Sequence, residues 1–248
     1  DTLGFSISGI ILNGPKEELD LTENTQPAIF LLSYSIFKLV KEEFNFDLNK
    51  ASFFAGHSLG EYSALASAGS LSFSDTLKIL KIRGSAMQSS VPKGAGGMVA
   101  VLGSKIEIIE NIIEKNKSNY ECFIANDNSD GQIVLSGNIS DLDKMILDLK
   151  LNNIKNIKLP VSAPFHCSLM SKATKTMTEE LNKLDFKQSK NKLISNVTAK
   201  EIENTNELKN LLIRQIENRV RWRESVINMI KNGVNHFIEI GPGKVLSG

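Results

Sequence analysis

Residues 56–65 read GHSLGEYSAL, and they place Ser58 between two glycines where a strand pattern gives way to a helix pattern. The preceding residues 52–55, SFFA, are small, apolar or aromatic, whereas those after Ser58 are rich in helix formers. A strand–turn–helix of this kind strains its central residue, and flanking glycines such as Gly56 and Gly60 let neighbouring backbone pass. Ser58 is therefore a candidate nucleophile, and the alternative is a serine that caps the following helix.

The composition indicates a globular protein that acts in a reducing compartment. A chain of 248 residues that is 41% hydrophobic suits one large domain, with or without a smaller insert. The 29 basic and 28 acidic side chains leave a net charge of +1, which gives no support to nucleic acid or an anionic membrane as partner. Cys122 and Cys167 lie far apart without a metal-ligand spacing, so we expect no disulfide framework and no metal site.

Residues 96–160 have a pattern of their own and predict a small inserted domain. Strands and helices alternate there in the order β-α-β-β-α-β, which is the ferredoxin-like unit. The predicted strands are 97–103, 121–126, 131–137 and 156–161, and the predicted helices are 104–117 and 139–152.

The two outer segments, 1–95 and 161–248, predict one large α/β domain that shares a mainly parallel sheet. We expect a helix over 27–44 that begins with Pro27 in its first turn, and a helix over 72–91 capped by Ser72 or Ser74. Further helices are predicted near 206–217 and 223–232, and further strands over 192–197 and 236–241.

A serine nucleophile needs a base, and the chain has only three histidines. His57 precedes Ser58 directly, so its side chain should point to the opposite face. His236 opens a predicted strand, where a structural role is the simpler interpretation. His166 follows a strand and two prolines in a stiff loop, where catalytic groups of α/β sheets gather. His166 is therefore the candidate base, with a structural histidine as the alternative.

Arg83 stands out because it lies on an apolar helix face. Helical spacing places it beside Ile79, Ile82 and Ala86. A buried guanidinium is costly unless an anion pairs with it, and its planar fork suits a carboxylate. An internal salt bridge, or a side chain that extends to water, would account for it equally well.

Four stretches together resemble the malonyl-CoA:acyl carrier protein transacylases, the acyltransferase family of fatty acid biosynthesis. They are GHSLGEYSALASAGSLSFSDTLKILKIRGSAMQ (56–88), ANDNSDGQIVLSG (125–137), LPVSAPFHCSLM (159–170) and EIGPGKVLSG (239–248). The resemblance covers the chain from about residue 25 onward. It implies an α/β fold in which an α/β-hydrolase-like large domain carries the ferredoxin-like small domain.

The same resemblance implies a role for several residues. Ser58 would be the acylated nucleophile, His166 its base, and Arg83 the group that binds the malonyl carboxylate. Leu59 would offer its backbone N–H to the oxyanion. Backbone carbonyls near Gly241–Lys244 would orient the histidine in place of an acidic residue.

Three further residues complete the implied substrate site. Asn128 matches a position near the substrate cleft, and His57 is placed in the same site. Phe165 resembles the bulky residue of malonyl-selective enzymes, which would exclude a methyl-branched malonyl group. The implied partners are malonyl-CoA and acyl carrier protein, with no cofactor beyond these thioester carriers. We expect a monomer in the cytoplasm, or in an organelle if a targeting peptide was removed upstream.

The sequence also departs from the family pattern. The family's N-terminal strand and Gly-Gln-Gly-x-Gln loop have no match in residues 1–30, and the chain ends soon after Lys244 where relatives continue. We therefore expect a fragment, and loss of one oxyanion donor typically costs about 10²–10³-fold in rate. Asp130 and Arg219 each replace a usual proline, which affects local loop shape.

Two other functions remain open at this point. A serine esterase or thioesterase of the α/β-hydrolase type shares the elbow, but it would need an acidic residue and a late histidine. A truncated, inactive fragment that only binds carrier protein is the other. A chain that binds the acidic carrier protein would need a basic patch on its surface. Candidates for such a patch are Arg219, Arg221, Arg223, Lys78 and Lys81, although scattered surface charges are the simpler interpretation.

Overall fold

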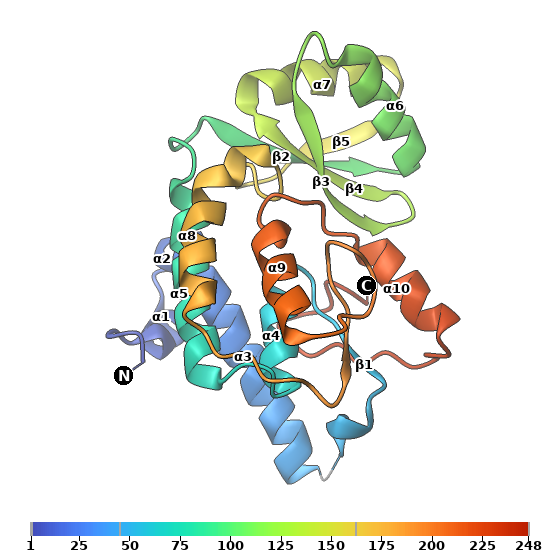
Figure 1. Ribbon diagram of the computed structural model, residues 1–248. Helices are drawn as coiled ribbons and strands as arrows, with labels where there is room; N and C mark the ends of the chain where they lie inside the picture. The colour runs from blue at the N-terminus through green and yellow to red at the C-terminus, as the bar shows by residue number, and fades with distance from the viewer. Residues whose placement is uncertain (1, 45, 162, 248) are drawn as a thin grey trace.

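The computed structural model describes residues 2–44, 46–161 and 163–247, which fold into two regions (Figure 1). A sheet with two helices forms the upper region in the figure. A mainly helical region lies below it and contains both ends of the chain. The chain passes from the lower region to the upper one and back.

The upper region is a four-stranded antiparallel sheet in the order β3-β4-β2-β5. Its strands are β2 (Gly96–Leu102), β3 (Cys122–Ser129), β4 (Gln132–Asn138) and β5 (Lys155–Lys158), and its helices are α6 (Ile106–Asn116) and α7 (Ile139–Leu151). This confirms the predicted β-α-β-β-α-β order. The strand order is that of a ferredoxin-like unit. The domain boundaries at residues 95 and 160 stay a prediction.

The upper region has its own apolar core because both helices are amphipathic. Helix α6 buries Ile106, Ile109 and Ile112 at helical spacing, and α7 buries Leu142 and its neighbours against the same sheet face. The opposite face of the sheet carries a smaller cluster of Met98, Ala125 and Val134. Phe165 packs against this cluster and against the core of the lower region. Phe165 therefore joins the two cores.

The lower region is built from helices around one large core. The longer helices are α3 (Thr22–Glu43), α4 (Leu59–Ser67), α5 (Phe73–Ser89), α8 (Ser171–Asn182), α9 (Thr205–Gln215) and α10 (Trp222–Lys231). The short elements are α1 (Ile7–Asn13), α2 (Lys16–Leu19), η1 (Leu48–Lys50) and η2 (Ser168–Met170). The helices predicted near 206–217 and 223–232 are confirmed as α9 and α10.

The sheet of the lower region is much smaller than the sequence predicts. Strand β1 (Phe53–Phe54) pairs in parallel with β6 (Lys192–Leu193), and these two strands make up the whole sheet among the described residues. The parallel pairing is as expected. The predicted strand over 236–241 is wrong, since that segment has no ladder partner in the described part of the chain. Phe237 and Ile238 in this segment are 52% and 60% exposed, so these apolar side chains do not pack into a sheet.

Helix α3 begins earlier than expected. It starts at Thr22, so Pro27 lies inside the helix and not in its first turn. Asn24 donates its side-chain N–H to the carbonyl of Glu18, and the Thr25 hydroxyl donates to that of Leu19. These two bonds tie the first turn to α2 and explain the earlier start. For α5, Ser72 is the N-cap and accepts from the backbone N–H of Asp75, so the first of the two predicted caps is confirmed.

Helices α3 and α5 approach each other very closely at Gly84. A Cβ at this position would lie 2.5 Å from backbone atoms of Thr22 and Glu23, so only glycine fits. This approach brings Arg83, the residue before Gly84, beside Gln26 of α3. The packing of two helices thus positions a buried cation.

Candidate active site

The turn between β1 and α4 holds Ser58 in a strained conformation. Its φ of 53° and ψ of −109° lie where few residues other than glycine are found. A Cβ on Gly56 would lie 1.9 Å from the carbonyl oxygen of Gly60, whereas one on Gly60 would meet open space. The first glycine of the motif is therefore required by close packing, and the second is not.

Asn196 fixes the backbone of this turn from the loop after β6. Its Oδ1 accepts from the Ser58 N–H at 2.7 Å, and its Nδ2 donates to the Gly56 carbonyl at 2.8 Å. Both ends of one amide therefore clamp the turn. Ser58 occupies the N-cap position of α4, but its side chain makes no capping hydrogen bond. The hydroxyl is free to point elsewhere.

The Ser58 hydroxyl points to His166, which is 108 residues later in the chain. The distance from Ser58 Oγ to His166 Nε2 is 2.9 Å. On the other side of the ring, Nδ1 lies 2.9 Å from the backbone carbonyl of Gln215. A carbonyl only accepts, so Nδ1 carries the proton and Nε2 is left to accept from the serine. This is the arrangement that a general base requires.

Burial keeps His166 neutral. The side chain is 4% exposed, and desolvation together with the nearby Arg83 cation lowers the pKa of His166 to about 3. His166 also has a φ of 59°. The nucleophile and the histidine facing it thus both sit in uncommon backbone conformations, which the surrounding packing must hold in place.

Arg83 reaches the same serine from α5. Its Nη2 donates to Ser58 Oγ at 3.1 Å and to Gln215 Oε1 at 2.9 Å, and its Nη1 donates to Gln26 Oε1 at 2.7 Å. The side chain is 1% exposed, and desolvation lowers its pKa. All three acceptors are neutral. The alternatives of a direct salt bridge or a side chain that extends to water therefore do not describe Arg83.

Gln215 and Glu61 belong to this site although the sequence did not single them out. The Gln215 side-chain N–H donates to the Ser58 carbonyl at 3.0 Å and to Glu61 Oε2 at 2.6 Å. A signal for Gln215 was present: it follows Leu208, Leu211 and Leu212 on the apolar face of α9, as Arg83 does on α5. Glu61 lies inside the elbow motif itself.

Residues 1–247 match the family described as acyl transferase domain. The malonyl CoA-acyl carrier protein transacylase of Bacillus subtilis is 41% identical over 250 residues, which cover 100% of this chain and 78% of that protein. The corresponding Escherichia coli protein is 36% identical over 99% of this chain and 79% of its own. The chain belongs to this acyltransferase family.

Solved structures agree with the fold of the acyltransferase. The malonyl CoA-acyl carrier protein transacylase of Clostridium perfringens is 39% identical with a TM-score of 0.93, covering 99% of this chain and 77% of that one. A malonyl-transacylase solved in complex with a type II PKS acyl-carrier protein is 35% identical with a TM-score of 0.94, covering 99% and 79%. The expected family and fold class are thereby confirmed.

The other predicted site residues of the acyltransferase lie around the elbow. His57 Nε2 donates to Asn128 Oδ1 at 2.8 Å, and its ring meets that of Trp222 edge-on with centroids 5.9 Å apart. Burial lowers the pKa of His57. Leu59 is the first residue of α4, so its backbone N–H has no acceptor within the helix. Phe165 lies next to His166 and half-buried between the two cores.

The prediction that backbone carbonyls near Gly241–Lys244 orient His166 is wrong. Residues 241–244 do not bond to the histidine, which instead donates to the Gln215 carbonyl at the end of α9. Pro242, Gly243 and Lys244 are exposed. The C-terminal segment lacks the predicted strand 236–241 to hold it, so nothing directs its carbonyls toward the ring. The expectation of a backbone carbonyl as the partner was correct, and its position was not.

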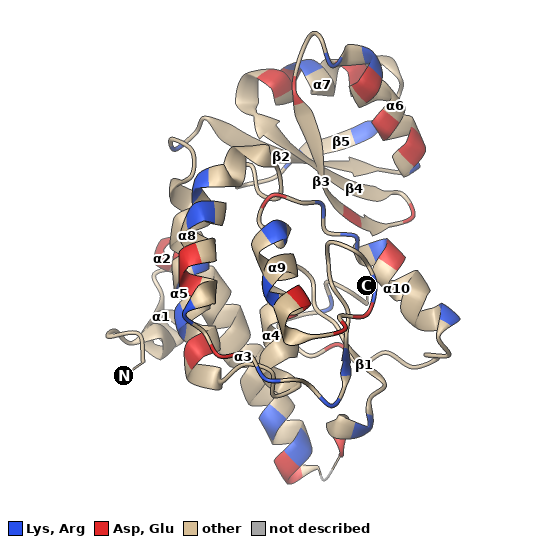
Figure 2. Ribbon diagram, in the orientation of Figure 1, with Lys and Arg blue, Asp and Glu red and all other residues tan. Residues whose placement is uncertain are grey.

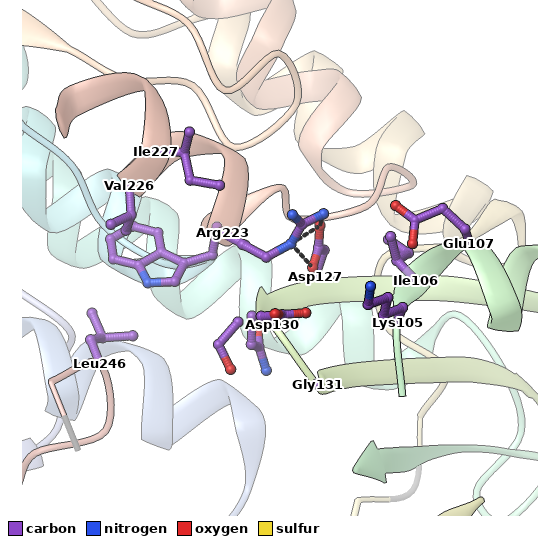
Figure 3. Close-up of a pocket in the computed structure, with 13 residues that line it drawn as sticks. Lys105, Ile106, Glu107, Asp127, Asp130, Gly131, Arg223, Val226, Ile227 and Leu246 are labelled. Carbon is purple, nitrogen blue, oxygen red and sulfur yellow. Dashed lines mark hydrogen bonds and ion pairs between the residues drawn. The ribbon is translucent and has the colours of Figure 1, made fainter. Parts of the chain in front are cut away.

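A pocket of about 710 Å³ has Asp127, Arg223 and Leu246 among the residues that line it (Figure 3). Asn128 and Trp222, which both contact His57, line it, so its wall is one side chain away from the residue before Ser58. Arg223 crosses the pocket to Asp127 and donates to both carboxylate oxygens at 2.9–3.1 Å. The pocket lies between α10 and the turn of β3 and β4.

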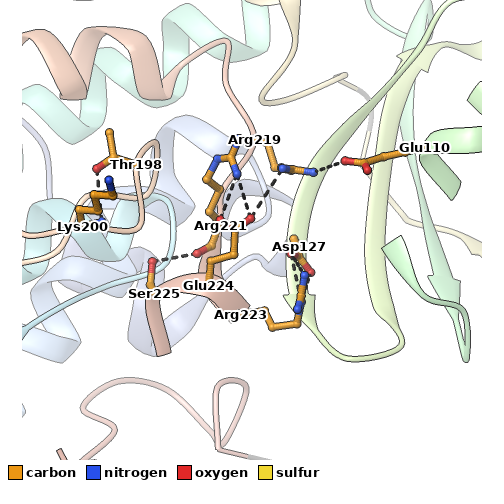
Figure 4. A network of polar contacts seen from close by, with 9 residues as sticks. All are labelled: Glu110, Asp127, Thr198, Lys200, Arg219, Arg221, Arg223, Glu224 and Ser225. Carbon is orange, nitrogen blue, oxygen red and sulfur yellow. Dashed lines mark hydrogen bonds and ion pairs between the residues drawn. The ribbon is translucent and has the colours of Figure 1, made fainter. Parts of the chain in front are cut away.

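The arginines near α10 form ion pairs and not a free basic patch (Figure 4). Arg223 pairs with Asp127, Arg219 pairs with Glu110, and Arg221 pairs with Glu224. The candidate positive patch at these arginines is not supported, because a carboxylate pairs with each of them, and the simpler interpretation of scattered surface charges describes them better. Lys81 likewise pairs with Glu23 on α3. The ribbon in Figure 2, coloured by residue type, shows acidic and basic residues interspersed along the helices in this view.

The described residues contain no group of three or more His, Cys, Asp or Glu side chains that is placed to hold a metal ion. Cys122 and Cys167 are both free and buried. In the part of the chain that the structure describes, no helix has the length and apolar character needed to cross a bilayer.

Proposed function

We propose that the acyltransferase moves a malonyl group from malonyl-CoA to the phosphopantetheine thiol of acyl carrier protein through a malonyl-Ser58 intermediate. One observation carries this proposal. The Ser58 hydroxyl lies between His166 Nε2, which accepts its proton, and Arg83 Nη2, a buried cation within reach of a bound acyl group. The family and its malonyl-transferring relatives support the choice of substrate.

The first half-reaction forms the acyl-enzyme. As Ser58 Oγ attacks the thioester carbonyl, His166 takes the hydroxyl proton at Nε2, and the Gln215 carbonyl stabilises the proton already on Nδ1. The Leu59 N–H at the start of α4 donates to the oxyanion. The tetrahedral intermediate then collapses, the C–S bond breaks, and His166 returns its proton to the CoA thiolate.

The second half-reaction runs the same steps with carrier protein. His166 takes the proton of the phosphopantetheine thiol, the thiolate attacks the malonyl-serine carbonyl, and the Ser58 oxygen leaves with the proton from His166. We expect no metal or other cofactor in this cycle, since the acyl groups arrive and depart as thioesters. Water has to be kept from the acyl-enzyme, as hydrolysis would compete with transfer.

Arg83 supplies selectivity in this mechanism. A malonyl carboxylate pairs with the buried guanidinium, whereas an acetyl group leaves it with neutral partners only. Phe165 next to His166 would narrow the space for a branched acyl chain. Asn128 orients His57 beside the elbow and lines the adjacent pocket.

The test is intact-protein mass spectrometry of the chain mixed with malonyl-CoA, before and after addition of carrier protein. Wild type should gain one malonyl group and lose it to carrier protein, and Ser58→Ala should gain none. Loss of the adduct to water without carrier protein would instead support the thioesterase alternative. A folded chain that forms no adduct would support the inactive-fragment alternative.

A matched pair of variants tests the selectivity. Arg83→Ala should lower malonyl transfer sharply and leave acetyl transfer largely unchanged, whereas Arg214→Ala, an exposed arginine on α9, should change neither. Equal losses on both substrates with Arg83→Ala would contradict the carboxylate role.

We further propose a monomer that acts in a reducing compartment, namely the cytoplasm or an organelle reached through an upstream targeting peptide. The two free, buried cysteines support the reducing compartment.

A further inference from the structure

Among the residues that the structure describes, Arg83 has no direct carboxylate partner. Its three acceptors, on Gln26, Gln215 and Ser58, carry no charge. A cation that is 1% exposed needs a nearby negative charge to offset the loss of its hydration. The three direct acceptors carry no charge. A carboxylate of the chain that supplies the charge must therefore contact one of these acceptors and not Arg83 itself.

Glu61 is that carboxylate. It is 2% exposed, and the Gln215 amide bridges it to Arg83, with Oε1 accepting from the guanidinium at 2.9 Å and Nε2 donating to Glu61 Oε2 at 2.6 Å. The backbone N–H of Asn196 donates to the same oxygen at 3.3 Å. Among the described residues, the other oxygen, Oε1, is buried without a hydrogen-bond partner. A proton on Oε1 would therefore break no existing contact.

We propose that Glu61 is the counter-ion of Arg83 in the free enzyme and takes up a proton from solvent when a malonyl carboxylate binds to Arg83. The inference rests on the proposed function, because it requires that Arg83 holds the substrate carboxylate. Two negative charges then compete for one buried cation. The substrate carboxylate contacts the guanidinium directly, and Glu61 reaches it only through an amide, so Glu61 is the group that becomes neutral.

The surroundings of Glu61 favour this exchange. Burial raises the pKa of Glu61 to about 7, while Gln215, Asn196 and Arg83 favour its ionised form. The other titratable groups nearby stay neutral at this pH, since burial raises the pKa of Tyr62 to about 12 and lowers that of His166 to about 3. Helix α3 faces the cluster with the neutral Gln26, and burial also lowers the pKa of His57 in the elbow. Arg83 is thus the charge to which Glu61 responds.

The sign of the pH dependence follows. Below about pH 7, Glu61 already carries its proton, so binding of malonyl-CoA takes up none. Above it, binding must recruit a proton, and affinity for malonyl-CoA falls by up to about tenfold per pH unit. Acetyl-CoA has no carboxylate for Arg83, so its affinity should not follow this trend. The CoA portion titrates identically in both ligands and cancels in the comparison.

Titration calorimetry with the Ser58→Ala chain tests the proposal without turnover. Malonyl-CoA and acetyl-CoA are each titrated at about pH 8 and about pH 6, in two buffers of different ionisation enthalpy, which reports protons taken up. We expect close to one proton for malonyl-CoA at about pH 8, little at about pH 6, and none specific to acetyl-CoA. An infrared difference spectrum should show a new protonated carboxyl band on malonyl-CoA binding at the higher pH.

Glu61→Gln in the same background assigns the proton. Gln keeps an acceptor for Gln215 and Asn196 but carries no charge, so the proton uptake specific to malonyl-CoA should vanish and the ratio of malonyl-CoA to acetyl-CoA affinity should become independent of pH. Glu180→Gln on the surface of α8 should leave the uptake unchanged. If Glu61→Gln does not fold, the infrared band in the Ser58→Ala chain still decides the question.

The outcomes separate this inference from the proposed function. Tighter binding of malonyl-CoA than of acetyl-CoA without proton uptake, or uptake that persists in Glu61→Gln, would overturn the role of Glu61 alone. Equal binding of the two thioesters without uptake would overturn the carboxylate role of Arg83, and the inference with it.

Discussion

The four-stranded sheet of the upper region and the serine turn of the lower region are held by different interactions. The sheet rests on antiparallel ladders, of which the β3–β4 ladder has two register shifts, and on a core of aliphatic side chains from α6 and α7. The turn rests on strained backbone at Ser58 and His166 and on buried amides and charges. A region of the first kind loses stability in proportion to the apolar surface removed. A region of the second kind depends on a few atoms that have no substitutes.

The largest expected effect separates chemistry from stability. His166→Ala removes the acceptor of the Ser58 proton, so acyl transfer should fall by about 10⁴-fold or more, as for other serine–histidine pairs. The free energy of unfolding should change by much less than the activation free energy of acyl transfer, since the substitution leaves the upper region unchanged. Stopped-flow acylation together with denaturant unfolding measures both. A loss of less than about tenfold would show that the serine does not depend on this base.

Gly56→Ala probes how tightly the serine turn is packed. The added Cβ would lie 1.9 Å from the Gly60 carbonyl oxygen and 2.7 Å from the Glu61 nitrogen, and these are backbone atoms that no side-chain rotation can move aside. We expect a loss of several kcal/mol of stability together with most of the activity. The matched control is Gly60→Ala, where the Cβ meets open space within α4 and should be neutral or slightly stabilising. Equal effects at the two glycines would contradict the packing asymmetry.

Leu135→Ala probes the sheet in the same way. Leu135 on β4 is fully buried in the core of the upper region. Its truncation should cost about 2–5 kcal/mol of unfolding free energy. The folded fraction should still form the malonyl adduct at close to the wild-type rate, because Leu135 touches no group of the serine site. Loss of activity in folded protein would mean that the two regions are coupled more tightly than their separate cores indicate.

The smallest expected effect concerns pH. His166 is held neutral with a pKa of about 3, below the ordinary value of 6.5, so the folded state binds fewer protons than the unfolded state in this window. Stability from this residue is present above about pH 6.5 and is lost as the pH falls, by at most about 1.4 kcal/mol per pH unit. Thermal unfolding from neutral to mildly acidic pH should therefore show a steeper loss for wild type than for His166→Ala. Parallel curves would contradict a neutral, buried histidine.

Glu61 opposes this trend, since its pKa of about 7 lies above the ordinary 4.5. Its folded state binds more protons between these values, so its contribution to stability is lost as the pH rises. The pH of greatest stability therefore reflects both groups. The His166→Ala comparison isolates the histidine, because Glu61 is present in both proteins.

The two regions also differ in how well sequence patterns predict them. In the upper region, antiparallel strands lie next to each other in sequence, and apolar residues at helical spacing mark α6 and α7, so every element was predicted. In the lower region, β1 pairs with β6 across more than a hundred residues, and no local pattern fixes such a partner. The apolar run at 236–241 looked like a strand, but a strand is defined by its neighbour.

The same limit applies to the serine site. Ser58 can be identified from a local sequence motif, and Arg83 from its charge on an apolar helix face. The partner of the His166 Nδ1 atom is a backbone carbonyl, which every residue possesses, so the sequence contains no mark that selects Gln215 over Gly241–Lys244. Glu61 and Asn196 act through hydrogen bonds to residues far away in the chain, and only the folded geometry reveals them.

Gln215 contributes its backbone oxygen to His166, its side-chain oxygen to Arg83 and its side-chain nitrogen to Ser58 and Glu61. Gln215, the last residue of α9, therefore sets three properties of the acyltransferase. They are the tautomer of the base, the placement of the cation and the shape of the serine turn. Selection acting on one of them acts on all three. Directed evolution toward a new acyl group should accordingly proceed through Arg83 or Phe165, where one property changes at a time, while position 215 stays fixed.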